Sequence, residues 1–299
     1  MKVFENFDGA KLSWFKAGGK IDVFAIVDTK EELLDVLDKY DNGKVMTVGA
    51  GSNLLIRDGG FHGLIIKLGQ GFNRTAIEVV DDREKHKILV AGASTQSSAV
   101  VQFAIRNNLV GAEFMSTIPG SIGGMTRMNA GCFGREVKDI FYNTNVLRRV
   151  GTWQEQVDNL AEMQFAYRHS TLNSEDIVME TRFLLKCGTA EDVEKSKQEI
   201  AEMQAHRKQN QVVGMTCGST FANPDGYSAW RLIASVGLRG HNINGAVFSE
   251  KHCNFIVNTG GASATDIENL IDLAKQKVKE DHGIDLRTEI CIVGEKLDK

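Results

Sequence analysis

A glycine-rich segment that directly follows a strand-like run constrains the fold of this chain more than any other feature. The segment is Gly49–Leu55, and the run Val45–Val48 precedes it. Glycine tolerates positive φ and lets successive backbone N–H groups converge, which is how a phosphate-binding nest forms. The pattern therefore favours either a plain turn after a strand or a cradle for a pyrophosphate. It is not a Rossmann fingerprint, because Leu54 occupies the third glycine position and no amphipathic helix follows.

A second run of small residues, Ser116–Gly124, continues into Met128–Gly134. So many small side chains allow a flat or phosphorylated ligand to approach the backbone closely, and Pro119 stiffens the approach. Close packing of backbone on backbone is the structural alternative. Two such segments in one unit suggest a dinucleotide ligand.

The surrounding sequence alternates between strand and helix patterns. Thr29 opens a capping box, and the polar stretch Glu191–Gln211 favours a helix that bridges an N-terminal unit and a C-terminal one. A second capping box at Thr265 predicts another helix with an apolar stripe, which His282-Gly283 ends. Further strands are expected at Asp22–Val27, Val45–Val48, Leu64–Leu68, Ile88–Ala91 and Phe255–Val257, and helices at Thr95–Asn107 and Tyr227–Val236. These signals predict an α+β chain of two parts.

Composition excludes several classes of protein. The chain has 299 residues, enough for two domains, and its net charge of -4 gives no basic field for nucleic acid. It lacks the roughly 20-residue apolar run of a membrane helix, and Met1–Ala10 carries acidic residues where a signal peptide would be apolar. The five cysteines fall into no zinc-ligand spacing. We expect a cytoplasmic protein that binds neither membrane nor nucleic acid and holds no metal.

Three polar segments could carry chemistry. Arg168, between aromatic and small polar residues, could hold a carboxylate with two parallel hydrogen bonds. Ser219 could donate a proton, and Asn223 in the same stretch could bond a polar ligand. Glu289, among apolar neighbours in the strand-like Leu286–Ile290, could act as an acid.

Each of these residues also has a simpler interpretation. Arg168 could be a surface arginine beside a packed tyrosine, Ser219 a turn or helix-capping serine, and Glu289 a solvated glutamate on an edge strand. A serine hydrolase is not supported, because Ser121 has glycine one residue before it rather than two and the G-x-S-x-G elbow is missing.

Together and in this order, these segments resemble the UDP-N-acetylenolpyruvoylglucosamine reductases, the MurB family, in its shorter form. The resemblance covers nearly the whole chain. The matching segments are Gly49–Leu55, Ile118–Gly124 with Met128–Gly131, Tyr167–Ser170, Gly218–Pro224 and Ser249–Asn258.

The resemblance implies a vanillyl-alcohol-oxidase-type FAD-binding domain over residues 1–190, with subdomains at about 1–70 and 71–190. A C-terminal α/β substrate-binding domain would occupy residues 191–299. FAD would be held without a covalent link and reduced by NADPH. The residues expected at FAD are Gly49, Gly51, Ser52, Asn53, Leu54, Ile118, Pro119, Gly120, Ser121, Gly123 and Gly124.

The resemblance also implies roles for the polar candidates. Hydride would reach the enolpyruvyl double bond of UDP-N-acetylglucosamine enolpyruvate, and Arg168 and Glu289 would stabilise the enol-like intermediate. Ser219 would give a proton to the second carbon. Asn223 would contact the substrate, and Arg207 its diphosphate.

Two residues depart from the family pattern. Ala222 stands where many members have lysine, which changes a substrate contact, and Thr117 replaces the usual glycine before Ile-Pro-Gly. Two other functions stay open: an FAD-dependent oxidase of the same fold acting on another small substrate, and a nucleotide-binding protein without catalysis.

Overall fold

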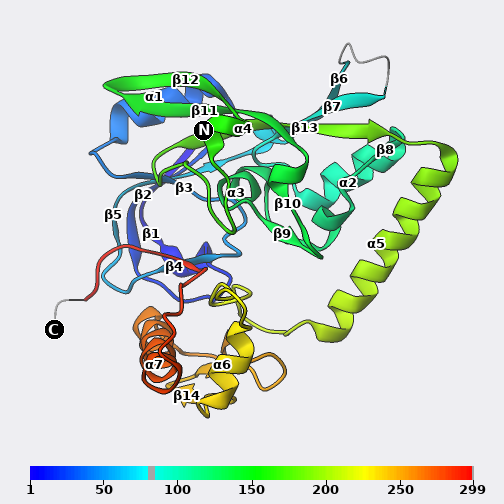
Figure 1. Cartoon of the computed structure of the whole chain (residues 1–299). Coiled ribbons are helices and arrows are strands. Elements are labelled where there is room, and N and C mark those ends of the chain that lie inside the picture. The colour runs from blue at the N-terminus through cyan, green and yellow to red at the C-terminus, as the bar shows by residue number, and fades with distance from the viewer. Residues whose placement is uncertain (80–84, 298–299) are drawn as a thin grey trace. The chain divides into compact units, whose positions relative to one another are not determined.

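The computed structural model describes residues 1–79 and 85–297 (Figure 1). The chain divides into two compact units, and each is assembled from separate stretches of sequence. The first unit comprises Met1–Val3, Ala25–Gly49 and Ile65–Gln209, and the second comprises Phe4–Phe24, Ala50–Leu64 and Asn210–Lys299. Helix α5 (Ala190–Asn210) belongs to the first unit through Gln209. The division into functional domains at residues 190 and 191 stays a prediction.

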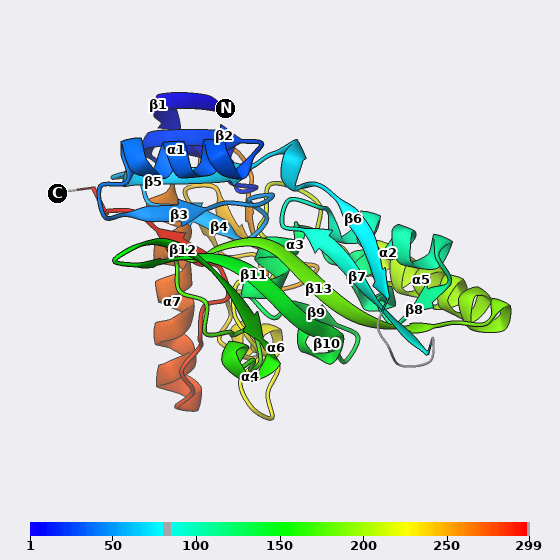
Figure 2. The same cartoon turned by 90° about the horizontal axis from the view of Figure 1, so that it is seen from above.

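The first unit contains a six-stranded antiparallel sheet in the order β12-β11-β13-β7-β6, with β8 also paired to β13. Figure 2 shows β12, β11 and β13 lying side by side. The strands are β6 (Thr75–Val79), β7 (His86–Gly92), β8 (Leu109–Val110), β11 (Phe141–Val150), β12 (Thr152–Asn159) and β13 (Ile177–Cys187). The predicted strand Ile88–Ala91 is confirmed and buried on both faces, as in a central strand.

Short helices cover this sheet. They are α2 (Ser97–Arg106), α3 (Ile122–Arg127) and α4 (Leu160–Met163). Helix α3 packs closely against the sheet because Gly123 donates its N–H to Ala93 O at 2.9 Å, and a Cβ at Gly123 would stand only 3.1 Å from the Ala93 methyl. The second glycine-rich segment therefore runs into a helix that the sequence did not predict.

The N-terminal region combines a helix with a four-stranded sheet in the order β1-β2-β5-β3. Helix α1 (Lys30–Tyr40) begins as predicted, because Thr29 Oγ1 accepts the Glu32 N–H. The strands are β1 (Lys2–Asp8), β2 (Lys20–Val27), β3 (Val45–Thr47) and β5 (Phe61–Leu68). Strands β1, β2 and β5 each run from one unit into the other, and the predicted strands in this region are confirmed.

The second unit is built on a parallel pair and a small antiparallel sheet. Strand β4 (Leu54–Ile56) pairs with β17 (Cys291–Val293), and β14 (Asn242–Ile243), β15 (Ala246–Phe248) and β16 (Ile256–Asn258) form the sheet. Two helices, α6 (Ala229–Ser235) and α7 (Ala264–His282), pack on them. Phe15 and Leu55, from the N-terminal part of the chain, belong to the same buried core as Phe221 and Phe248.

Two predicted boundaries in this unit are wrong. Helix α7 begins earlier than Thr265, because Ser263 Oγ accepts the Asp266 N–H while the Asp266 carboxylate accepts the Ser263 N–H. The predicted strand Leu286–Ile290 is instead an extended segment with a single bridge, and the regular strand starts at Cys291. The predicted apolar stripe of α7 and its end at Gly283, with φ +68°, are confirmed.

A β-hairpin of β9 (Gly131–Cys132) and β10 (Arg135–Glu136) follows α3 in the first unit.

Among the helices of the described residues, none combines the length and the apolar character needed to span a membrane.

Candidate active site

Arg168 sits in a tight turn of the first unit. Its φ is +55°, and the turn is closed by reciprocal backbone hydrogen bonds between Ala166 and His169 at 3.1 and 3.0 Å. The guanidinium lies over the Tyr167 ring, with its carbon 4.9 Å from the ring centroid, and Nη2 donates to Gly131 O at 2.7 Å. A left-handed arginine is an uncommon conformation, so the turn is held by its surroundings rather than by its own preference.

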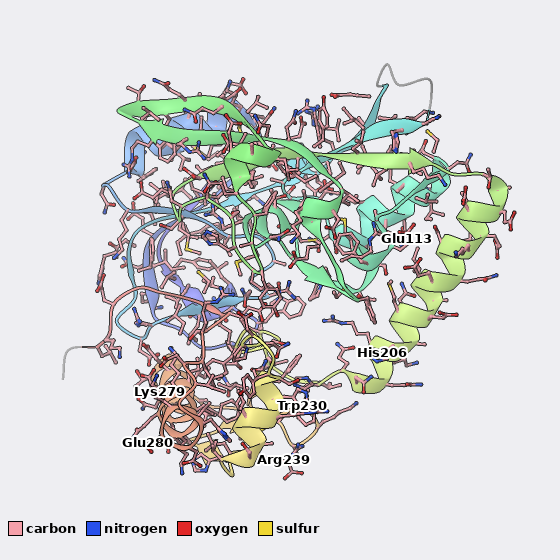
Figure 3. All side chains as sticks on the ribbon, in the orientation of Figure 1. Glu113, His206, Trp230, Arg239, Lys279 and Glu280 are labelled. Atoms are coloured by element: carbon pink, nitrogen blue, oxygen red, sulfur yellow. The ribbon has the colours of Figure 1, made fainter. Side chains whose placement is uncertain are left out.

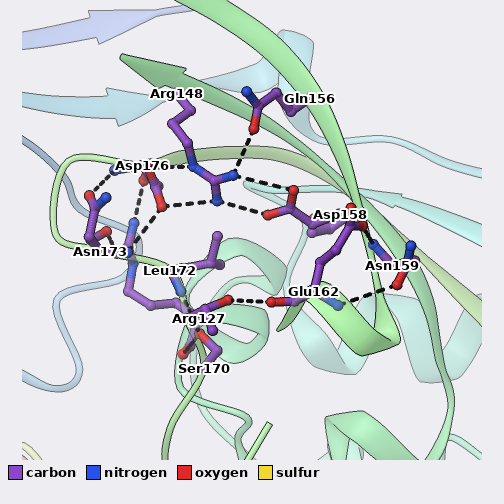
Figure 4. Close-up of polar contacts among 12 residues, drawn as sticks. Arg127, Arg148, Gln156, Asp158, Asn159, Glu162, Ser170, Leu172, Asn173 and Asp176 are labelled. Carbon is purple, nitrogen blue, oxygen red and sulfur yellow. Dashed lines mark hydrogen bonds and ion pairs between the residues drawn. The ribbon is translucent and has the colours of Figure 1, made fainter. Parts of the chain in front are cut away.

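A polar network holds the segment that follows Arg168 (Figure 4). Arg148 Nε donates to the buried Asp176 carboxylate at 3.1 Å, and hydrogen bonding to Asp176 raises the pKa of Arg148. Arg127, the last residue of α3, donates to two backbone carbonyls of the same segment, and Ser170 Oγ donates to Arg127 O at 2.6 Å. The network therefore ties the segment after Arg168 to the helix that continues the second glycine-rich segment.

Arg207 lies on the C-terminal part of α5 close to Cys132. Figure 3 shows the neighbouring His206 on this part of the helix, where its ring meets Phe133 edge-on with centroids 5.6 Å apart. Burial lowers the pKa of the Arg207 guanidinium, and the nearby Cys132 sulfur partly offsets that effect. Within residues 1–79 and 85–297, no carboxylate pairs with Arg207. A half-buried cation without a protein counter-ion suits an anionic ligand.

Thr117, one of the two departures from the family pattern, also contacts Cys132. Thr117 Oγ1 lies 3.4 Å from Cys132 Sγ, and the thiol lies 3.0 Å from the acceptor Phe114 O. Burial raises the pKa of the Cys132 thiol despite the hydrogen bond from Thr117. The contact joins the two parts of the second glycine-rich segment, Ser116–Gly124 and Met128–Gly134.

The two glycine-rich segments meet in the first unit. A Cβ built at Gly49 would overlap Ser121 Oγ, so glycine at this position permits the contact. Gly124 is exposed, and a Cβ built there would meet nothing within 4 Å. Pro119 is also exposed, and Gly120 has a φ of +134°. The second segment thus presents open space above its backbone at Gly124.

The segments that carry Ser219 and Glu289 pair in the second unit. The segments that carry them pair at a bridge between Phe221 and Thr288, and the Glu289 N–H donates to Thr220 O at 2.8 Å. Both Ser219 and Glu289 are half-buried. This pairing brings two segments that are far apart in sequence into one part of the second unit.

The rest of the first glycine-rich segment also lies in the second unit. Gly51, with φ +70°, packs against the Leu12 carbonyl, and Leu54 is buried in β4. Asn53 Nδ2 donates to Glu289 O at 3.0 Å. Ser52, which stands between Gly51 and Asn53 in the sequence, is half-buried.

Asn223 and Ala222 lie on the approach to α6. Asn223 Oδ1 accepts the Ala229 N–H at 2.9 Å, although the residue itself is exposed. Ala222 is buried, and its N–H donates to Arg287 O at 3.0 Å. Asn223 therefore organises the turn before α6 as well as offering an amide to solvent.

Comparison with known proteins decides the family. A model of the UDP-N-acetylenolpyruvoylglucosamine reductase C-terminal domain matches residues 208–293, and a model of an FAD binding domain matches residues 21–155. The chain is 41% identical to the UDP-N-acetylenolpyruvoylglucosamine reductase of Orientia tsutsugamushi (strain Ikeda), over 98% of this chain and 94% of that protein. The chain belongs to the UDP-N-acetylenolpyruvoylglucosamine reductase family. The reductase of Rickettsia akari is 39% identical over 97% of this chain and 95% of that protein.

A solved structure agrees with this membership. The UDP-N-acetylenolpyruvylglucosamine reductase (MurB) of Thermus caldophilus superposes with a TM-score of 0.78 at 30% identity, covering 97% of this chain and 98% of that one. The predicted fold, an α+β chain with an FAD-binding domain of the vanillyl-alcohol-oxidase type, is confirmed. The predicted family and its FAD cofactor are likewise confirmed.

The residues of this reductase family member fit the flavin nucleotide. Ser116 Oγ, at the start of the second glycine-rich segment, is buried and finds no hydrogen-bond partner in the described part of the chain. Gly124, in the same segment, is exposed and has open space where a side chain would stand, which leaves room for a flat or phosphorylated group. An unsatisfied buried hydroxyl beside such backbone is what a bound polar ligand would complete.

Sequence reasoning missed two residues of this site, Asn129 and Glu136. Both contact the region of Arg168, and Asn129 has a left-handed φ of +43° while being fully buried. Asn129 lay inside a segment already singled out, and an asparagine between small residues could have signalled the left-handed turn.

Over the residues that the structure describes, no group of three or more His, Cys, Asp or Glu side chains could hold a metal ion.

Proposed function

We propose that this chain is an NADPH-dependent flavoenzyme that reduces the enolpyruvyl double bond of UDP-N-acetylglucosamine enolpyruvate to give UDP-N-acetylmuramate. The observation that carries the proposal is the full-length similarity to reductases of this name, with Arg168, Ser219 and Glu289 all in the matching segments. The product is a peptidoglycan precursor. Because the substrates are a nucleotide sugar and NADPH, we place the reaction in the cytoplasm.

When bound, FAD would supply the hydride after its reduction by NADPH. As hydride reaches the terminal carbon of the double bond, negative charge moves toward the substrate carboxylate. Arg168 holds that carboxylate and stabilises the charge, because a guanidinium stays protonated at any working pH and can donate two parallel hydrogen bonds. Glu289 supplies a further hydrogen bond or proton to the enol-like species.

Ser219 then gives a proton to the second carbon. Its place beside the Glu289 segment supports this role, because the donor and the enol-stabilising carboxyl group must serve the same three-carbon unit. The proton donor and the hydride donor add to adjacent carbons, so the reduction is complete after one transfer from each.

Arg207 and Asn223 would bind the nucleotide part of the substrate. The absence of any carboxylate partner for Arg207 within the described residues supports a diphosphate contact. Asn223 is exposed and carries an amide donor, which supports a hydrogen bond to the substrate.

An anaerobic visible spectrum tests the proposal. The purified protein should show flavin bands that one equivalent of NADPH bleaches and that UDP-N-acetylglucosamine enolpyruvate restores. If oxygen restores the bleached flavin bands and the enolpyruvyl substrate does not, an oxidase of the same fold would be favoured. A colourless protein that neither binds added FAD nor oxidises NADPH would favour nucleotide binding without catalysis.

A further inference from the structure

The guanidinium of Arg168 rests on the hairpin of β9 and β10. Nη2 donates to Gly131 O at 2.7 Å, and Nη1 lies 3.8 Å from Glu136 Oε1. Gly131 and Glu136 are partners in the register of this hairpin. One pair of facing residues therefore contacts both amino groups of the same guanidinium.

The hairpin requires glycine at position 131. A Cβ built on Gly131 would overlap the Arg135 carbonyl oxygen and stand 2.8 Å from Glu136 Cγ. Since backbone cannot yield as a flexible side chain can, any larger residue would push the two strands apart. The close approach places the Glu136 carboxylate beside the carbonyl that accepts from Arg168.

Asn129 joins this hairpin to the turn that carries Arg168. Asn129 Nδ2 donates to Glu136 Oε2 at 3.1 Å and to Ala166 O at 2.9 Å, while its Oδ1 accepts the Lys138 N–H at 3.0 Å. Ala166 closes the same turn through its bonds to His169. Because Asn129 is fully buried, water does not compete for these hydrogen bonds.

We propose that Glu136 is a positioning residue that holds the guanidinium of Arg168 in its reactive orientation, with Asn129 locking Glu136 to the Arg168 turn. The inference rests on the proposed role of Arg168 in the reduction. An arginine side chain has several rotatable bonds, so a fixed carboxylate and a fixed carbonyl at its tip remove much of its freedom before substrate arrives. Glu136 acts through Arg168 rather than on the substrate.

Glu136→Gln is the first test, since glutamine keeps one oxygen to accept from Asn129, while it removes the charge and replaces the other oxygen with an NH2 donor. We expect flavin reduction by NADPH to be unchanged and reoxidation by the enolpyruvyl substrate to slow about tenfold, because misplacing a reacting group by about 1 Å costs up to about 100-fold in rate. Glu136→Asp, which retracts the carboxylate, should give a similar loss if the glutamine variant does not fold. Lys138→Gln is the matched control, because Lys138 Nζ meets the same carboxylate at 2.8 Å with its side chain 43% exposed.

A double-mutant cycle separates positioning from general damage. If Glu136 acts through Arg168, adding Glu136→Gln to Arg168→Lys should cause no further loss. A second tenfold loss in that background would overturn the proposal.

A crystal structure of the Glu136→Gln variant tests whether Glu136 positions the Arg168 guanidinium, and it does so without any measurement of activity. We expect the Arg168 guanidinium to leave Gly131 O, and an unmoved guanidinium would overturn the positioning role. If the wild-type protein fails to reduce the enolpyruvyl substrate, the proposed function falls, while this structure still decides whether Glu136 positions Arg168.

Discussion

The Asn53 side-chain amide donates to the backbone carbonyl of Glu289 at 3.0 Å, across 236 positions of sequence. The Cys291 N–H returns a hydrogen bond to Asn53 O at 3.0 Å, where β17 joins β4. The first glycine-rich segment therefore fixes the backbone of a proposed catalytic residue, in addition to its expected place at the flavin.

Asn53→Ala should disturb this link. We expect reoxidation of the reduced flavin by the enolpyruvyl substrate to slow about tenfold at saturating FAD, because the Glu289 backbone loses its anchor. Stopped-flow absorbance at the flavin bands measures this step. Asn73→Ala, which removes an exposed side-chain contact to Gln70, is the control and should leave the rate unchanged. An unaltered rate for Asn53→Ala would show that the anchor is dispensable.

The sequence predicted the parts of this site whose chemistry is local. Thr29 predicts the start of α1 correctly, because an N-cap hydrogen bond depends only on residues within the first turn of the helix. The prediction that no helix follows the first glycine-rich segment is also correct, because Leu54–Ile56 forms strand β4. The predicted start at Thr265 is wrong because Ser263 and Thr265 each have an acidic residue three positions on, Asp266 and Glu268, so this pattern alone does not distinguish them. In the structure the Thr265 hydroxyl instead donates to Asp58 at 2.6 Å.

Contacts between distant segments could not be derived from patterns. The two compact units take segments from both ends of the chain, and neither periodicity nor composition encodes such a division. The link from Asn129 to Glu136 and Ala166 depends on a left-handed backbone and a close hairpin, which only the folded chain displays. Resemblance to a family supplied the roles of Arg168, Ser219 and Glu289, and these roles stay predictions.

Ser219→Ala should separate the two half-reactions. Flavin reduction by NADPH should be intact, while reoxidation by the enolpyruvyl substrate should fall about 100-fold to 10,000-fold, the usual range for a lost proton donor. Rapid-mixing absorbance measures both steps. Ser228→Ala is the matched control, because the Ser228 side chain makes no capping bond at the start of α6. Equal loss in both half-reactions would contradict the assigned role.

Arg207→Gln should raise the KM for the sugar nucleotide about tenfold with little change in kcat, because a phosphate contact binds ground state and transition state alike. The KM of the wild type should also rise with salt, and this dependence should weaken in the variant. Steady-state kinetics at two ionic strengths measure both effects. Lys208→Gln, at the neighbouring exposed position, should behave as wild type. A lowered kcat with unchanged KM would place Arg207 elsewhere in the reaction.

Glu268 should make stability depend on pH. Burial of Glu268 favours a higher pKa, but the hydrogen bond and charge of Arg57, with the charge of Lys296, outweigh burial and lower the pKa. Because the folded-state pKa lies below the unfolded value, the stabilisation is present at neutral pH and is lost as the pH falls through the folded-state pKa.

Glu268→Gln should therefore lower the free energy of unfolding by about 1 to 3 kcal/mol near neutral pH, and the difference from wild type should shrink in acid. Urea unfolding followed by circular dichroism at several pH values measures this. Glu280→Gln, on the exposed face of the same helix (Figure 3), should show no such trend. A difference that stays constant with pH would rule out ionisation as the cause.

The pairing of β4 with β17 also bears on how the chain is made. Strand β4 contains Leu54–Ile56, and its parallel partner Cys291–Val293 lies far downstream in the sequence, so it is synthesised long after β4. Phe15 and Leu55 likewise lack most of their native core neighbours until the C-terminal residues of that core have been synthesised. Until β17 and the rest of this core have been synthesised, these apolar segments lack their native neighbours, so a ribosome stalled before β17 would carry a nascent chain with exposed apolar strands that chaperones can bind.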